Sequence, residues 1–280
     1  MTDHEWVDQH GNEIEDHDRG LRNDLITMLD RRRALTILGG LGVAGVVGAC
    51  SSGSTGPTRT SGSGGSGTTA GGALVEVPDE TAGPFPGDGS NGQNVLDDSG
   101  IVRSDIRASF GTSSTVAEGV PLTIRITVKD TATSQALVGA AVYAWHCDRA
   151  GNYSLYSSGF EGENYLRGVQ ETDDTGTVTF TSVFPGCYPG RWPHVHFEVY
   201  GTVADAVSSG PLVKTSQLAL PQAASEAVYA SSGYESSVRN LGRLSLETDN
   251  VFRDDGGVHQ LATMSGSNDT GWTAHLTIGV

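Results

Sequence analysis

Apolar and polar residues alternate with a period of two in several short segments in the C-terminal three quarters of the chain. Many of the apolar positions hold β-branched or aromatic residues. Successive side chains of a strand point to opposite faces, so this pattern predicts strands that bury at least one face. The alternating segments lie within 122–128, 176–183, 195–200, 212–220 and 273–280, and a mostly apolar run at 140–145 predicts a further strand.

Clusters of Asp, Asn, Ser, Thr and Gly separate these segments and predict turns. They occur at 130–134, 148–152, 173–176 and 254–257. Short strands divided by turns are typical of an all-β fold, and we predict an antiparallel β-sandwich. Residues 74–280 are more than a sandwich of this kind needs, so we also expect long loops, and one short helix within 226–241.

The N-terminal region has a different pattern. Residues 1–30 hold nine Asp or Glu and two Arg, three arginines follow at 31–33, and residues 34–49 are mildly apolar with five glycines. This order predicts a twin-arginine-type lipoprotein signal segment over 1–49. The five glycines disfavour an ordinary N-terminal helix, and sixteen residues are short for an uncleaved membrane anchor.

Residues 50–73 are rich in Gly, Ser and Thr and predict a flexible linker. We expect Cys50 to carry a lipid that holds an exported protein at the outer face of the cell membrane. No other membrane contact is expected, because no low-glycine apolar run is long enough to span a bilayer. The net charge of −16 argues against a nucleic acid partner.

Candidate chemistry gathers in residues 184–200. His194 and His196 stand two apart at the start of a predicted strand, so both imidazoles share one face. Neutral imidazole is the commonest metal ligand in proteins, although a histidine pair bonded to backbone is the simpler reading of this spacing. Tyr188 and Arg191 precede the pair in a loop interrupted by prolines, and such a loop is costly to order unless it positions something.

Several spaced motifs in this region resemble those of the intradiol ring-cleavage dioxygenases. The resemblance is clearest over residues 75–200. The motifs are Trp145-His-Cys-Asp-Arg-Ala-Gly-Asn-Tyr153, Tyr165-Leu-Arg-Gly-Val-Gln170, Asp174-Thr-Gly-Thr-Val-Thr-Phe180, Pro185-Gly-Cys-Tyr188 and Arg191-Trp-Pro-His194-Val-His196.

The resemblance implies a non-haem Fe(III) site with Tyr188 and His194 as axial ligands and Tyr153 and His196 as equatorial ligands. Tyr188 would also take up a proton from the substrate. Arg191 matches a family arginine that stabilises charge on the substrate ring. The resemblance also implies that Gly83, Pro84 and Phe85 line the substrate pocket.

The resemblance implies a dioxygenase that uses O₂ to open a catechol-type aromatic diol between its two hydroxyl carbons, giving a cis,cis-muconate-type product. Residues 74–105 are too short and polar for the helical dimerisation region of intracellular family members, so the chain looks like a smaller, exported branch. The preferred diol and the oligomeric state stay open.

Two cysteines remain beside Cys50. Cys147 and Cys187 each precede a proposed tyrosine ligand, and we expect a disulfide between them in an oxidising compartment, with two buried thiols as the alternative. Two other functions compete: a non-catalytic transthyretin-like extracellular binding sandwich, and a zinc hydrolase that uses His194, His196 and Glu198. Neither gives the two tyrosines a role.

Overall fold

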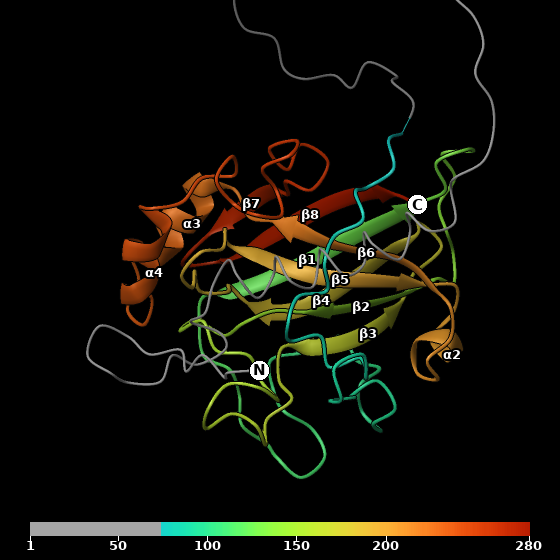
Figure 1. The fold of residues 1–280 in the computed structure, drawn as a ribbon, viewed down its shortest axis with the longest axis horizontal. Helices are drawn as coiled ribbons and strands as arrows, with labels where there is room; N and C mark the ends of the chain where they lie inside the picture. Colours follow the sequence, from blue (N-terminus) through green and yellow to red (C-terminus); the bar gives the residue numbers. More distant parts are fainter. Residues whose placement is uncertain (1–73) are drawn as a thin grey trace, which may run out of the picture.

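The protein folds as a β-sandwich, as predicted, and its two layers are four-stranded sheets (Figure 1). The computed structural model describes residues 74–280, so the predicted signal segment, Cys50 and the linker lie outside the described residues. One sheet has the order β4-β1-β8-β7 and the other β3-β2-β5-β6. The strands are β1 (Pro121–Lys129), β2 (Ala141–Trp145), β3 (Arg167–Glu171), β4 (Thr177–Val183), β5 (His194–Tyr200), β6 (Leu212–Ala219), β7 (Thr263–Ser267) and β8 (Gly271–Gly279).

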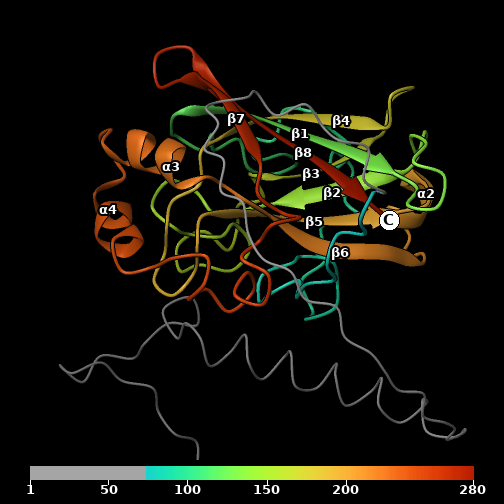
Figure 2. The ribbon, with the colours of Figure 1, turned by 90° about the horizontal axis from the view of Figure 1, so that it is seen from above.

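The main core lies between the sheets, which form two layers in Figure 2. Ile124 and Ile126 of β1 face Val195 and Phe197 of β5, and all four side chains are fully buried in one apolar cluster. Burial of each such side chain contributes about 1.5–3 kcal/mol. The alternation in β1 and β5 therefore reflects a shared apolar interior, as predicted.

The outer face of the β3-β2-β5-β6 sheet is also buried, beneath a second apolar cluster. In β5 the residues that point outward are His194, His196, Glu198 and Tyr200, and every residue of the strand is buried. The register places Trp145 of β2 beside His196, and His196 beside Gln217 of β6. The polar half of the β5 alternation thus faces a covered outer surface instead of solvent.

Two segments cover the part of this outer face near the start of β5, whereas residues 95–101 and 203–207 pack over the rest. We call residues 80–87 the strap; its Glu80 N–H donates to the Thr215 carbonyl of β6 over 2.8 Å. Arg167 of β3 is buried and donates to the carbonyls of Phe85 (3.0 Å) and Pro86 (2.8 Å). The loop between β2 and β3 packs beside the strap, with the rings of Phe85 and Tyr153 4.9 Å apart. The strap and this loop form the roof of the outer face.

The structure adds elements that the alternation does not reveal. Strand β3 begins with an arginine and a glycine, and a Cβ on Gly168 would lie 2.5 Å from Ile106 Cγ2, so close packing excludes a side chain there. Where the sequence predicts one short helix, the structure has two, α3 (Gln222–Tyr229) and α4 (Glu235–Leu241). The chain turns between them at Gly233, which has φ +92°. A four-residue helix, α2 (Val203–Ala206), follows β5.

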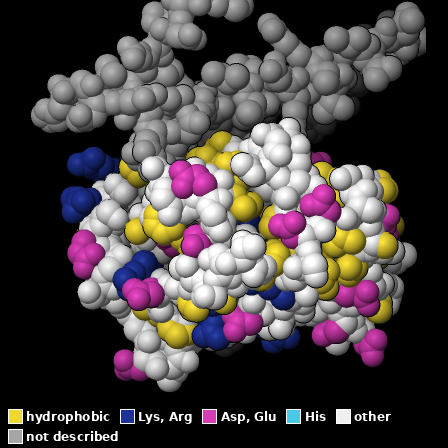
Figure 3. Space-filling model, turned by 90° about the horizontal axis from the view of Figure 1, so that it is seen from below, with side chains coloured by type: hydrophobic (Ala, Val, Ile, Leu, Met, Phe, Trp, Pro, Cys, Tyr) yellow, Lys and Arg dark blue, Asp and Glu magenta, His cyan; other side chains and the backbone are white. Residues whose placement is uncertain are grey.

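The strand pairing is antiparallel except between β1 and β8, which run parallel. Acidic side chains are dispersed over the face shown in Figure 3, with Lys and Arg between them. Within residues 74–280, no helix has the length and apolar character needed to cross a membrane.

Candidate metal centre

Four donor atoms converge on the outer face of the sheet where β5 begins. His194 and His196 lie on the same face, as their spacing predicts, with their Nε2 atoms 3.0 Å apart. The hydroxyls of Tyr153 and Tyr188 lie 3.5 Å from each other, and 3.4 Å and 3.2 Å, respectively, from His194 Nε2. The structure thus brings together two imidazoles and two phenols from three separate parts of the chain.

The tyrosines reach this point because two loops pack against each other without side chains between them. Asp148 caps the first loop by accepting from the N–H groups of Ala150 and Asn152. Gly151 in that loop has φ +97°, and a Cβ there would lie 3.1 Å from Tyr188 Cβ. Gly151 therefore allows the loop that carries Tyr153 to lie directly against the loop that carries Tyr188.

Helices α3 and α4 hold the second loop from the other side. Ser237 Oγ accepts from the Cys187 N–H (2.9 Å), and Asn240 Nδ2 donates to the Cys187 carbonyl (2.7 Å). Tyr229 and Tyr234 donate their hydroxyls to the carbonyls of Pro185 and Phe184. The proline-interrupted loop is therefore ordered by the two helices, which fixes Tyr188 next to Cys187.

The two histidines have different surroundings. His194 Nδ1 donates to the Trp192 carbonyl at 2.5 Å, which leaves the lone pair on Nε2, the nitrogen nearest the tyrosines. His196 stacks on Trp145 with ring centroids 4.9 Å apart and planes 6° apart, and its buried Nδ1 has no hydrogen-bond partner. The orientation of His196 rests on ring stacking, whereas that of His194 rests on a hydrogen bond.

The donor set is chemically suited to a hard cation. Burial lowers the pKa of both imidazoles below its ordinary value, so both present neutral nitrogen at pH 7. Burial also raises the pKa of Tyr153, a direction that a bound cation reverses because it stabilises phenolate. Tyr153 and both histidines are at most 3% exposed, whereas Tyr188 is half-buried. The residues fit Fe(III), and Tyr188 is the donor nearest solvent.

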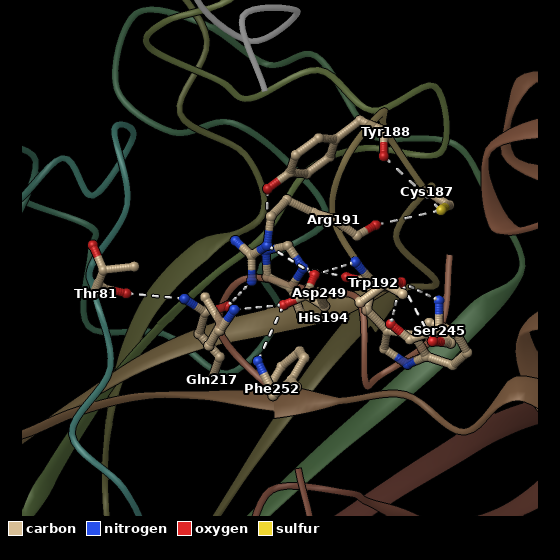
Figure 4. A network of polar contacts seen from close by, with 12 residues as sticks. Thr81, Cys187, Tyr188, Arg191, Trp192, His194, Gln217, Ser245, Asp249 and Phe252 are labelled. Atoms are coloured by element: carbon tan, nitrogen blue, oxygen red, sulfur yellow. Dashed lines mark hydrogen bonds and ion pairs between the residues drawn. The ribbon is translucent and has the colours of Figure 1, made fainter. Parts of the chain in front are cut away.

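Arg191 lies beside these donors in a buried polar chain (Figure 4). Its Nε donates to Asp249 Oδ2 (3.0 Å), and its Nη2 donates to Gln217 Oε1 (2.6 Å). Gln217 Nε2 in turn donates to the Thr81 carbonyl in the strap (2.9 Å). Sequence reasoning missed Asp249 and Gln217, because their role depends on tertiary contact with Arg191 and neither stands in a motif.

The strap places the predicted pocket residues over the donors. Gly83 has φ +72°, and a Cβ there would lie 3.2 Å from His196 Cε1, so its backbone rests on the imidazole. Phe85, 8% exposed, packs against Tyr153 and Tyr156. Gly83 and Phe85 thus lie at the site, with Pro84 between them.

The expected Cys147–Cys187 disulfide is wrong for this structure, in which both residues are free, buried thiols. Each sulfur faces a different backbone carbonyl: Cys147 Sγ lies 3.5 Å from the Gly186 oxygen, and Cys187 Sγ lies 3.5 Å from the Arg191 oxygen. The alternative of two separate buried thiols therefore describes the structure.

Among residues 74–280, the zinc alternative lacks a third suitable ligand. Glu198 accepts from the Tyr200 hydroxyl at 2.7 Å, further along β5 from the imidazole pair. In the part of the chain that the structure describes, no group of three or more His, Cys, Asp or Glu side chains could hold a metal ion. Among residues 74–280, the donors that lie beside His194 are the hydroxyls of Tyr153 and Tyr188.

No family model and no curated protein matches the chain in sequence. Among solved structures, an intradiol ring-cleavage dioxygenase from Tetranychus urticae matches with 25% identity and a TM-score of 0.54, covering 65% of this chain and 87% of that one. The dioxygenase domain of a carbohydrate-binding fusion protein from Streptomyces sp. SirexAA-E matches with 23% identity and a TM-score of 0.47, covering 74% and 98%. The described domain has the fold of the intradiol ring-cleavage dioxygenases, the oxidoreductase family that its motifs resemble.

Proposed function

We propose that the protein is a non-haem Fe(III) dioxygenase that uses O₂ to cleave a small catechol-type diol between its hydroxyl carbons, giving a cis,cis-muconate-type product. The observation that supports this most strongly is the convergence of Tyr153, Tyr188, His194 and His196, whose donor atoms contact one another over 3.0–3.5 Å. A binding sandwich without a metal gives no purpose to the costly burial of Tyr153, His194 and His196 beside Tyr188.

The bound iron would supply a Lewis acid that activates the diol toward O₂. Tyr153, His194 and His196 are almost fully buried and would hold the metal throughout. Tyr188 is half-buried and makes its contacts from a loop, so it is the ligand best placed to leave the metal and accept a proton from the incoming diol.

Arg191 would stabilise negative charge on the substrate. Arg191 is 2% exposed, so the field of its guanidinium is screened little by water and is worth more than that of a surface arginine. The strap would exclude water from above, because Gly83 rests on His196 and Phe85 packs on Tyr153. These residues position and shield the diol without changing their own protonation.

We also propose that the enzyme works outside the cytoplasm, held at the outer face of the cell membrane by a lipid on Cys50. The support is the order of segments in the sequence: paired arginines, a short apolar stretch, Cys50 and a Gly/Ser/Thr-rich linker. Mass analysis of the protein from a membrane fraction tests this, since an N-terminus at Cys50 with added lipid mass is expected.

The test of the reaction is the visible spectrum of the purified, iron-loaded full chain, recorded before and after catechol is added without oxygen. Tyrosinate bound to Fe(III) absorbs visible light, and direct coordination of catechol shifts the band. Admission of O₂ should then yield a ring-opened dicarboxylate. A protein that stays colourless with iron excludes the proposal and leaves the metal-free binding sandwich.

A further inference from the structure

One buried carboxylate contacts both the arginine and the backbone of the candidate metal centre. Asp249 lies in the segment between α4 and β7 and is 0% exposed. Its Oδ2 accepts from Arg191 Nε (3.0 Å) and from the Trp192 N–H (2.7 Å), as Figure 4 shows. Its Oδ1 accepts from the N–H groups of Val251 (2.8 Å) and Phe252 (3.2 Å). All four donors are backbone amides or the guanidinium, so the carboxylate is held rigidly.

The contact with Trp192 reaches a proposed metal ligand. The Trp192 carbonyl is the acceptor for His194 Nδ1, so the conformation of Trp192 sets the orientation and tautomer of that imidazole. Trp192 is fixed at a second point, because its indole Nε1 donates to the Leu220 carbonyl (2.8 Å). Trp192 is thus held by Asp249 and by Leu220, and of these two partners only Asp249 also binds Arg191.

We propose that Asp249 is a positioning residue that sets Arg191 through its side chain and His194 through the Trp192 backbone. The inference rests on the proposed function, since it assigns Asp249 a task within that site. One carboxylate oxygen receives both contacts, so a shift of Asp249 would displace the arginine and the histidine together. The α4–β7 segment thereby keeps Arg191 in register with the proposed metal ligand His194.

A carboxylate is required because all its neighbours are donors. An asparagine at position 249 has the same shape but one oxygen and one NH₂ group. Whichever way the amide turns, the NH₂ faces either Arg191 Nε and the Trp192 N–H or the two amides of Val251 and Phe252. Donor would face donor at a fully buried position, where an unmade hydrogen bond is costly.

The experiment compares the full chain with its Asp249→Asn variant, both loaded with iron. We expect Asp249→Asn to lower kcat/KM by about 10–100-fold, to weaken iron binding and to shift the visible band. Asp173→Asn is the matched control: Asp173 caps the β3–β4 turn by accepting from the N–H groups of Thr175 and Thr177. Strand β3 enters this turn at the end of the sheet where β5 ends, opposite His194. The control should keep the wild-type iron affinity, band and kinetics.

A second comparison separates the two contacts. If Asp249 acts through Trp192 as well as Arg191, the double variant Asp249→Asn with Arg191→Leu binds iron more weakly than Arg191→Leu alone. Equal iron affinity in the two overturns the route through His194. Wild-type iron affinity, band and kinetics in Asp249→Asn overturn the proposal as a whole.

The wild-type protein distinguishes this proposal from the proposed function. A wild type without colour or turnover refutes the dioxygenase itself, whereas a coloured, active wild type matched by Asp249→Asn refutes only the role of Asp249. If Asp249→Asn does not fold, Asp249→Glu replaces it, because it keeps the charge and displaces the oxygens by one methylene. Wild-type iron affinity and kcat/KM in Asp249→Glu would then contradict the positioning role.

Discussion

Among single residues, the four donors differ in how firmly the fold holds them. His194 is fixed by a hydrogen bond to the Trp192 carbonyl, His196 by stacking on Trp145, and Tyr153 by full burial. Tyr188 is half-buried and contacts His194 edge-on, with ring centroids 5.7 Å apart. The least enclosed donor is thus the one to which the proposed mechanism assigns movement and proton transfer.

Removal of the Tyr188 hydroxyl should separate metal binding from turnover. Tyr188→Phe keeps the ring and its contact with His194 but loses the oxygen, so three donors can still retain iron. We expect turnover to fall by about 10²–10⁴-fold, the usual contribution of a positioned acid or base. Iron content and steady-state rates measure the two effects, and wild-type turnover in the variant would refute the proton-accepting role.

Loss of either imidazole should instead remove the metal. His194→Ala and His196→Ala each delete a buried nitrogen donor, and we expect the iron-to-chain ratio to fall close to zero. His275→Ala is the control, because His275 on β8 bonds to Thr127 on the adjacent β1, and both strands belong to the sheet that does not carry the candidate site. Metal analysis of the three purified variants decides the matter: normal iron in either site variant would place the metal elsewhere.

At the scale of the elements, the alternation predicts those strands that have apolar residues on the face toward the core and polar residues on the opposite face. Strand β5 satisfies this with Val195 and Phe197 inward and the histidines outward. Strand β3 could not be found in this way, because it consists of Arg-Gly-Val-Gln-Glu and depends on pairing with β2 and on the buried hydrogen bonds of Arg167. Strand β7 is equally unmarked, since its Thr-Met-Ser-Gly-Ser sequence is paired only through β8.

The same distinction applies to the site. Motif resemblance supplied the tyrosines, the histidines and Arg191, whose order and spacing are local properties of the chain. Asp249 and Gln217 contact Arg191 from segments 58 and 26 residues away, and nothing in their own neighbourhoods marks them. The disulfide was predicted from the expected approach of two loops; the loops do approach, but their sulfurs face different carbonyls.

The strap offers a test at this scale. Gly83→Ala forces a side chain into a left-handed backbone conformation and places its Cβ 3.2 Å from His196 Cε1. The conformational part should cost about 1–2 kcal/mol of unfolding free energy. The contact should in addition displace His196 or lift the strap, reducing kcat/KM and altering the visible band of the iron-loaded protein.

Gly111→Ala provides the matched control for the strap. Gly111 has φ +76°, and a Cβ there would meet nothing within 4 Å. Both variants should lose similar stability in urea unfolding, because they share the backbone penalty. Only Gly83→Ala should change the spectrum and kinetics; equal spectra and kinetics in the two would show that the strap does not press on the site.

At the scale of the whole molecule, residues 76–80, which lead into the strap, contact both sheets. Glu76 pairs with Gly279 at the end of β8, and Glu80 bonds to Thr215 of β6. Lys214 of β6, 4% exposed, contacts the carboxylates of Glu76 and Asp79. The strap is therefore anchored on both layers of the sandwich, and its stability is tied to that of the whole domain.

Glu80 makes this anchorage sensitive to pH. Burial, reinforced by the charges of Asp254 and Asp255, raises the pKa of Glu80 to about 8, although Gln260 and Arg191 act in the opposite direction. The folded state therefore holds a proton on Glu80 between its ordinary pKa near 4.5 and about 8, whereas the unfolded state does not. Linkage then requires that this group's contribution to stability falls as pH rises through that window.

Glu80→Gln should remove that dependence, since glutamine does not titrate and resembles the protonated acid. Near pH 5 the wild-type protein and the variant should have similar unfolding free energies. At pH 8 the variant should be the more stable one, by on the order of 2 kcal/mol, because folding of the wild type must then take up a proton that the unfolded chain has released. Urea unfolding of both full chains at the two pH values measures the difference, and comparison with the wild type cancels the other titrating groups. Parallel pH profiles would mean that Glu80 is already ionised in the folded protein and that the strap is anchored without a protonated carboxyl.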